Sequence, residues 1–111
     1  MSNIATTPEP PYYAVIFTSI RKDGDNGYAD MAELMISLAK KQPGFLGIEE
    51  TSNDIGITVS YWTDQDSIQQ WKENSEHIIA QNNGRTLWYE AFKTRICKVE
   101  RDYQFNSSIE N

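Results

Sequence analysis

The stretch PGFLGIEETSNDIGITVSYWTDQDSIQQWKENSEH, residues 43–77, decides the fold of this chain. Pro43-Gly44 ends a preceding helix, because proline and glycine do not continue one. Phe45–Thr51 and Ile55–Trp62 are predicted strands, joined by a hairpin-length run of turn formers. Thr63-Asp64 then offers an N-cap for a helix. The stretch therefore predicts a unit of strand, turn, strand and helix.

The segments on either side complete the set of elements. Tyr12–Ile20 is dense in β-branched and aromatic residues, at odd-numbered and even-numbered positions alike. This pattern predicts a strand buried on both faces, in the middle of a sheet. In Tyr28–Ala39 the apolar residues recur at intervals of three and four, which predicts an amphipathic helix. The helix after Asp64 has a predicted break at Asn74–Glu76. Leu87–Phe105 alternates as one long final strand.

The order of these elements favours an α+β fold. A ferredoxin-like βαββαβ unit has a four-stranded antiparallel sheet with two helices on one face. Because the first and last strands are apolar at both parities, the second face of the sheet would expose a large apolar patch, so we predict a homodimer that pairs two sheets. The folded domain is expected at residues 12–105, between a flexible N-terminal arm at 1–11 and a flexible tail at 106–111.

Composition excludes several classes of partner and site. The 111 residues carry a formal net charge of −6 without a basic patch, so neither nucleic acid nor a membrane surface is an expected partner. Cys97 is the single cysteine, which excludes an internal disulfide. Glu49 and Glu50 lack a spacing suited to acid/base catalysis and are expected to be solvated. A reducing compartment and the lack of a signal or membrane-spanning pattern indicate a cytoplasmic protein.

The two faces of the second hairpin strand differ in chemistry. Ile57 and Val59 lie on one face, which is predicted to be core. Thr58 and Ser60 share the other face with Trp62. An aromatic wall beside a few polar groups is typical of a small-molecule pocket, so this second face is a candidate binding surface.

His77 and Trp71 are the candidates for chemistry on the second helix. His77 is the single histidine, a residue type that titrates near neutral pH and can remove a phenolic proton. The alternative is a solvated helix residue, because six residues of unbroken helix would turn His77 away from Trp71. Trp71 lies on the apolar stripe and either packs in the core or lines a site.

The chain resembles the antibiotic biosynthesis monooxygenase family over about residues 12–105. The resemblance rests on the Pro43-Gly44-Phe45 helix stop, the Tyr61-Trp62 strand end, Trp71, and the Ser75-Glu76-His77 segment. It implies a dimeric α+β barrel built on a ferredoxin-like unit. It also implies a monooxygenase that oxidises a small aromatic or quinol-like compound with molecular oxygen and no bound cofactor. The site residues expected on these grounds are His77 and Trp71 for catalysis and Trp62, Ser60, Thr58, Ser19 and Trp88 for substrate binding.

Two alternatives stay open. A haem-degrading branch of the family uses an asparagine on the first strand and a histidine about ten residues after the helix tryptophan. This chain departs from that pattern, because it has Thr18 or Ser19 at the first position and Gln81 at the second. Haem degradation, with haem as the cofactor, is therefore the second choice rather than the first. A non-catalytic small-molecule-binding or stress-response module is the other alternative.

Overall fold

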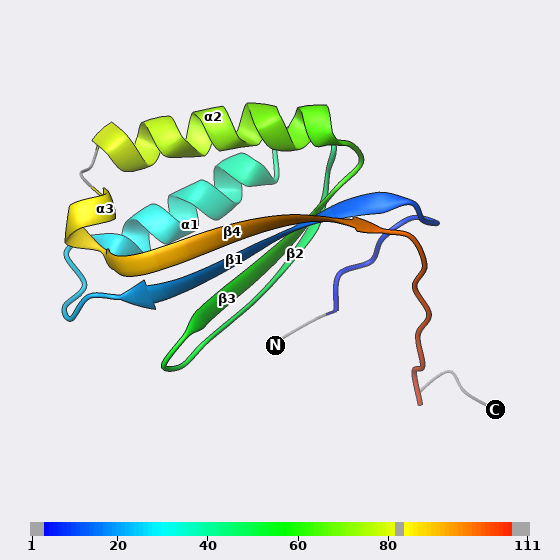
Figure 1. Ribbon diagram of the computed structural model, residues 1–111, viewed down its shortest axis with the longest axis horizontal. Helices are drawn as coiled ribbons and strands as arrows, with labels where there is room; N and C mark the ends of the chain where they lie inside the picture. The colour runs from blue at the N-terminus through cyan, green and yellow to red at the C-terminus, as the bar shows by residue number, and fades with distance from the viewer. Residues whose placement is uncertain (1–3, 82–83, 108–111) are drawn as a thin grey trace.

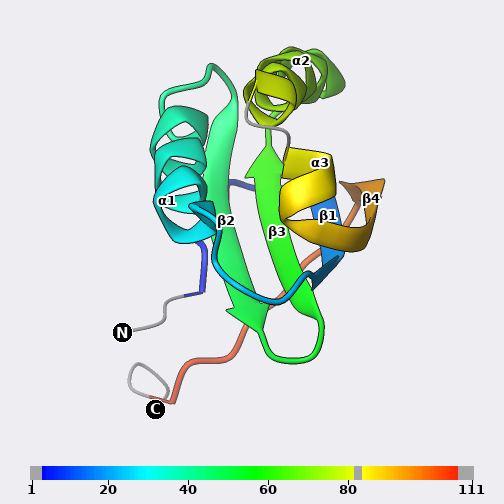
Figure 2. The same cartoon turned by 90° about the vertical axis from the view of Figure 1, so that its left-hand side faces the viewer.

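The computed structural model describes residues 4–81 and 84–107. Its elements are β1 (Tyr12–Arg21), α1 (Tyr28–Ala39), β2 (Phe45–Ser52), β3 (Gly56–Trp62), α2 (Gln65–Gln81), α3 (Gly84–Leu87) and β4 (Tyr89–Val99). The long helices α1 and α2 cover the same face of the sheet (Figure 1 and Figure 2). Residues 1–3 and 108–111 of the predicted arm and tail lie outside the described residues.

The four strands form one antiparallel sheet in the order β2-β3-β1-β4. β1 lies in the middle, as its apolar residues at both parities predict, and pairs with β3 on one side and β4 on the other. Ala14, for example, lies between Tyr61 and Cys97. This arrangement confirms the predicted ferredoxin-like α+β fold.

Alternation along the strands gives the sheet a helix-facing side and an outer side. Thr58 and Ser60 lie on the helix-facing side together with Val15, the partner of Ser60 in β1. Ile57 and Val59 consequently lie on the outer side, and Ile57 is 38% exposed. The prediction that the face with Ile57 and Val59 is core was wrong for the single chain. Both long helices instead cover the face that carries Thr58 and Ser60.

α2 is one continuous helix from Gln65 to Gln81, so the break predicted at Asn74–Glu76 was wrong. The Ser75 hydroxyl donates to the carbonyl of Lys72 at 3.1 Å, so the helix backbone accommodates this polar side chain. The predicted N-cap is confirmed, since Asp64 Oδ1 accepts the backbone N–H of Ser67 at 2.7 Å.

β4 begins later and ends earlier than the predicted strand. The strand starts later because residues 84–87 form the helical turn α3. The Trp88 N–H donates to the Gly84 carbonyl at 2.9 Å and closes this turn. Its end follows from pairing, because Val99 lies opposite Tyr12, the first residue of its neighbour β1. A register shift after Ile20 inserts one extra residue near the start of β4, a β-bulge.

The outer side of the sheet carries part of the N-terminal segment. The Ala5 N–H donates to Glu49 Oε2 at 2.9 Å, and the Thr7 hydroxyl donates to the Tyr12 hydroxyl at 3.0 Å. Glu49 also accepts the hydroxyl of Tyr61 at 2.6 Å. Glu49 is thus half-buried and engaged, rather than solvated as predicted. None of the helices in the described ranges is long and apolar enough to cross a membrane.

Candidate functional site

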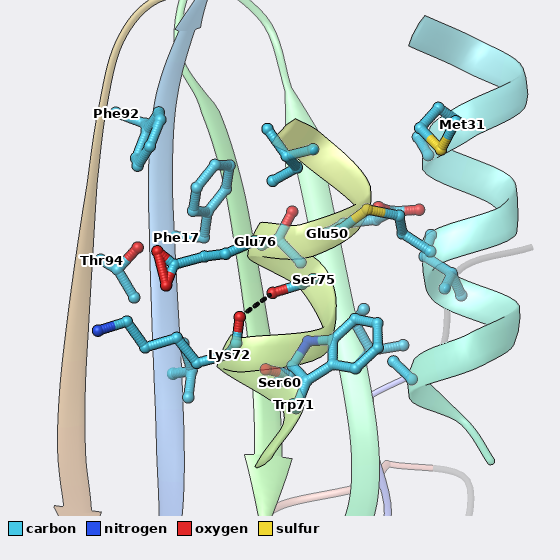
Figure 3. Close-up of a pocket in the computed structure, with 18 of the residues that line it drawn as sticks. Phe17, Met31, Glu50, Ser60, Trp71, Lys72, Ser75, Glu76, Phe92 and Thr94 are labelled. Carbon is cyan, nitrogen blue, oxygen red and sulfur yellow. Dashed lines mark hydrogen bonds between the residues drawn. The ribbon is translucent and has the colours of Figure 1, made fainter. Parts of the chain in front are cut away.

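A cavity of about 380 Å³ lies between the sheet and the two long helices. Side chains of α1, α2 and all four strands line it, and Figure 3 shows the stacked layers that enclose it. Ile96 of β4 lines the cavity and is 51% exposed, so the cavity opens to solvent along this edge strand. A volume of a few hundred Å³ is typical of small-molecule sites.

One end of the cavity is closed by Trp71. The cap at Asp64 sets the start of α2, and two turns later Trp71 reaches the cavity wall. Its indole stacks on the ring of Trp62, with 6.4 Å between centroids and 24° between planes. Trp62 is fully buried, donates from Nε1 to Ser60 Oγ at 2.9 Å, and meets Phe45 edge-on. Trp62 therefore packs behind Trp71, and the Trp71 indole forms part of the cavity surface.

The other end of the cavity is a cluster of aromatic rings. Phe17 of β1 packs against Tyr89 and Phe92 at centroid distances of 5.7 and 5.3 Å. Tyr28 of α1 makes edge-to-face contacts with Trp88 and Tyr89, and the Arg21 guanidinium lies over the Tyr28 ring at 3.3 Å from its centroid. All five rings line the cavity. They lie together because β1, the start of β4 and the start of α1 converge there.

The β-bulge at the start of β4 places Tyr89. Strict alternation would put residues 89 and 92 on opposite faces, but the extra residue brings both rings against Phe17. Tyr89 is buried, and burial together with the neighbouring Tyr28 raises the pKa of its hydroxyl. Its phenol therefore stays protonated at alkaline pH values at which an ordinary tyrosine ionises.

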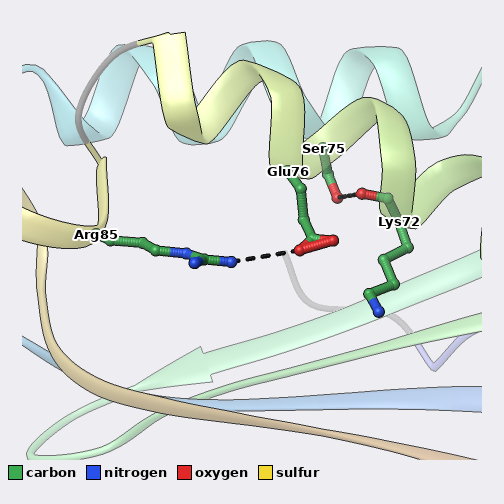
Figure 4. A network of polar contacts seen from close by, with 4 residues as sticks. All are labelled: Lys72, Ser75, Glu76 and Arg85. Carbon is green, nitrogen blue, oxygen red and sulfur yellow. Dashed lines mark hydrogen bonds and ion pairs between the residues drawn. The ribbon is translucent and has the colours of Figure 1, made fainter.

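Charged side chains lie along the middle of the cavity. Glu50 contributes from β2, and Lys72 and Glu76 contribute from successive turns of α2. Arg85 forms an ion pair with Glu76 at 3.3 Å, in which the side chains are 66% and 44% exposed (Figure 4). This pair spans from α3 to α2 at the open side of the cavity, and at such exposure it adds little to stability.

A comparison with curated proteins identifies a relative. The uncharacterised protein YqjZ of Bacillus subtilis (strain 168) is 47% identical over 110 residues, which cover 97% of this chain and 96% of YqjZ. This chain belongs to the YqjZ family. No family model matches the chain.

Solved structures relate the fold of this YqjZ-family chain to oxygenases. SnoaB from Streptomyces nogalater, a cofactor-independent oxygenase, superposes with a TM-score of 0.68 at 10% identity, over 84% of this chain and 97% of SnoaB. A proposed antibiotic biosynthesis monooxygenase of Nitrosomonas europaea gives a TM-score of 0.62 at 10% identity, over 83% and 92% of the two chains. The fold of the antibiotic biosynthesis monooxygenases, implied by the sequence resemblance, is confirmed.

The structure brings together four of the seven side chains predicted for the site. Trp71, Ser60, Thr58 and Trp88 line the cavity. Their predicted roles in catalysis and substrate binding stay predictions. Thr58 and Ser60 are on the wall because β3 turns this parity toward the helices.

The other three predicted side chains lie elsewhere. Trp62 is buried behind Trp71, and Ser19 is buried near Gly56 at one end of the helix-facing side. His77 is exposed and is not among the lining residues, because the unbroken α2 turns it away from Trp71. As His77 is the single histidine of the chain, the lining contains no imidazole that could ligate a haem iron. Gln81, the other residue relevant to haem, has a side chain outside those described.

Sequence reasoning assigned no site role to Glu50, Lys72, Glu76 or Tyr89, which all line the cavity. The position of Glu50 could have been predicted from the sequence. It lies on the same face of β2 as Ile48 and opposite Thr58 in the hairpin. No comparable signal existed for Tyr89, because the bulge overrides its parity. Among the described residues, three or more side chains suited to a metal do not gather at any point.

Proposed function

We propose that this protein is a small oxidoreductase that binds a planar aromatic or quinol-like compound in the cavity and oxidises it with molecular oxygen, without a bound cofactor. The observation that carries the proposal is the cavity itself. It has the Trp71 indole at one end, five aromatic rings at the other, and the hydroxyls of Thr58 and Ser60 on its floor. The fold shared with SnoaB supports the same chemistry.

The reaction requires an electron-rich substrate anion. Removing a proton from a quinol or anthrol produces an anion that can pass electrons to oxygen, and a hydroperoxide then forms on the ring carbon. Loss of water from the hydroperoxide leaves a new carbonyl, so one oxygen atom enters the product and the other ends in water. The aromatic walls exclude solvent from the ring.

We assign the proton removal to Glu50 rather than to His77. Glu50 lies on the cavity wall, whereas a bound ring would have to reach the outside of α2 to meet His77. Glu50 is also exposed, so its carboxylate can pass the proton on to solvent.

Oxygen consumption with anthrone tests this function. The protein should accelerate oxidation above the rate in buffer, with one oxygen molecule consumed per anthraquinone formed. Glu50→Gln should lower kcat about 100-fold, since a general base contributes on this scale, while His77→Gln should keep the wild-type rate. A loss in His77→Gln with full activity in Glu50→Gln would return the role to the histidine. Binding of anthrone without turnover would instead support the non-catalytic module.

We also propose that two copies pair through the outer side of the sheet. Ile20, Ile55 and Ile57 are 41%, 48% and 38% exposed there, on the side that α1 and α2 do not cover. Light scattering at micromolar concentration should give twice the mass of the chain, and Ile57→Lys should give the single mass. A wild-type monomer would contradict this pairing.

A further inference from the structure

Two cations line the cavity, and the exposed Lys72 is the one that forms no ion pair with a described residue. The neighbouring cation, Arg85, is already paired with Glu76. Glu76 is one turn from Lys72 on α2, but Figure 4 shows its carboxylate turned toward Arg85 while Lys72 extends toward the sheet. The cavity thus contains one ammonium group whose charge is not met by a protein carboxylate.

The direction of Lys72 places this ammonium group beside a bound ring. Lys72 follows Trp71 directly on α2, and Figure 3 shows its side chain extending toward β1 and β4, where Thr94 also lines the cavity. Glu50 lies at the opposite side, toward α1. A ring held against Trp71 would therefore have a cationic donor at one edge and a carboxylate at the other.

The charge of the whole protein makes this group selective. A net charge of −6 repels anions, so attraction for an anionic ligand must come from a local cation. An ammonium that donates to a carboxylate or phenolate oxygen forms a charge-assisted hydrogen bond, which is stronger than the neutral equivalent.

We infer that Lys72 is a specificity residue that binds an anionic oxygen of the ligand, so that the cavity selects aromatic carboxylates and phenolates over their neutral counterparts. This inference rests on the proposed function, because it needs an aromatic ligand in the cavity. It adds the class of that ligand: a planar ring with an ionised oxygen at the edge that faces β1 and β4.

Binding of 2-naphthoate and of 2-naphthamide, two probes of nearly equal shape, tests the inference by quenching of tryptophan fluorescence. At pH 7 the wild type should bind the naphthoate about tenfold more tightly than the amide, as expected for one hydrogen bond to a charged group. The preference should fall in high salt. Lys72→Met should remove the preference and leave the affinity for the amide unchanged, while Lys72→Arg should keep it.

Lys93→Met is the matched control. Lys93 is an exposed residue of β4 opposite Thr18, on the outer side of the sheet, so the variant removes the same charge away from the cavity. It should keep the tenfold preference. Equal binding of both probes by the wild type, or an unchanged preference in Lys72→Met, would overturn the role of Lys72 and leave the aromatic cavity intact. If neither probe binds, the proposed function is overturned as well.

Discussion

The indoles of Trp62 and Trp71 stack across the boundary between β3 and α2, with their centroids 6.4 Å apart. Trp62 is inaccessible to solvent, and Trp71 is half-buried on the cavity wall. Two residues of the same type thus have different positions: Trp62 lies in the core and Trp71 lies on the wall of the cavity. This division can be tested with one pair of variants.

Trp62→Ala should destabilise the fold more than Trp71→Ala does. Removing a fully buried tryptophan leaves a cavity and typically costs about 3–5 kcal/mol, and the half-buried Trp71 should cost less. Trp71→Ala should instead weaken binding of 2-naphthamide. Urea unfolding measures the first effect and fluorescence titration the second. Equal losses of stability in the two variants would contradict the division.

Gly44→Ala should destabilise the turn between α1 and β2. Gly44 has a φ of +85°, and a Cβ there would lie 2.2 Å from Ser67 Oγ. Gly27→Ala is the matched control, because Gly27 has a φ of +84° with nothing within 4 Å of the added Cβ. The control should cost about 1–2 kcal/mol from the backbone alone, and Gly44→Ala should cost clearly more. Thermal unfolding measures both, and equal shifts in Tm would argue against the steric contact.

Tyr89→Phe should make stability less sensitive to alkaline pH. Burial raises the pKa of Tyr89 in the folded state, so above about pH 10 the unfolded chain ionises this phenol while the folded chain does not. The wild type should therefore lose up to about 1.4 kcal/mol of stability per pH unit from this group as the pH rises above 10.

The measurement is urea unfolding at pH 8 and at pH 11. The wild type should lose more stability between the two than Tyr89→Phe. Part of the loss should remain in the variant, since the pKa of Tyr61 is also raised, mainly by burial and by Glu49. Identical pH dependence in the two proteins would show that Tyr89 is ionised as easily when folded as when unfolded.

Glu76→Gln should strengthen binding of 2-naphthoate a few-fold. The change removes a carboxylate from the cavity and leaves Arg85 without its partner beside Lys72. Stability should change by less than about 1 kcal/mol, because both partners of the ion pair are largely exposed. Titration with naphthoate and with naphthamide checks the effect, and a gain of equal size for the neutral amide would exclude an electrostatic cause.

The sequence by itself determined the elements and their order. The apolar residues in Tyr28–Ala39 recur with the period of a helix turn, and the cap at Asp64 is a contact between residues three apart. Both can therefore be inferred from residues that are close in the sequence. The mixed parity of Tyr12–Ile20 likewise indicated the central strand. These local rules were sufficient for the ferredoxin-like topology.

Only the tertiary structure decided which residues form the site. Alternation in β3 separates Ser60 from Ile57 but does not say which of them faces the helices; packing of α1 and α2 decides that. The bulge that turns Tyr89 inward depends on pairing with β1, and the direction of Lys72 depends on how α2 lies over the sheet. Each of these is a contact between residues far apart in the chain, which local periodicity does not encode.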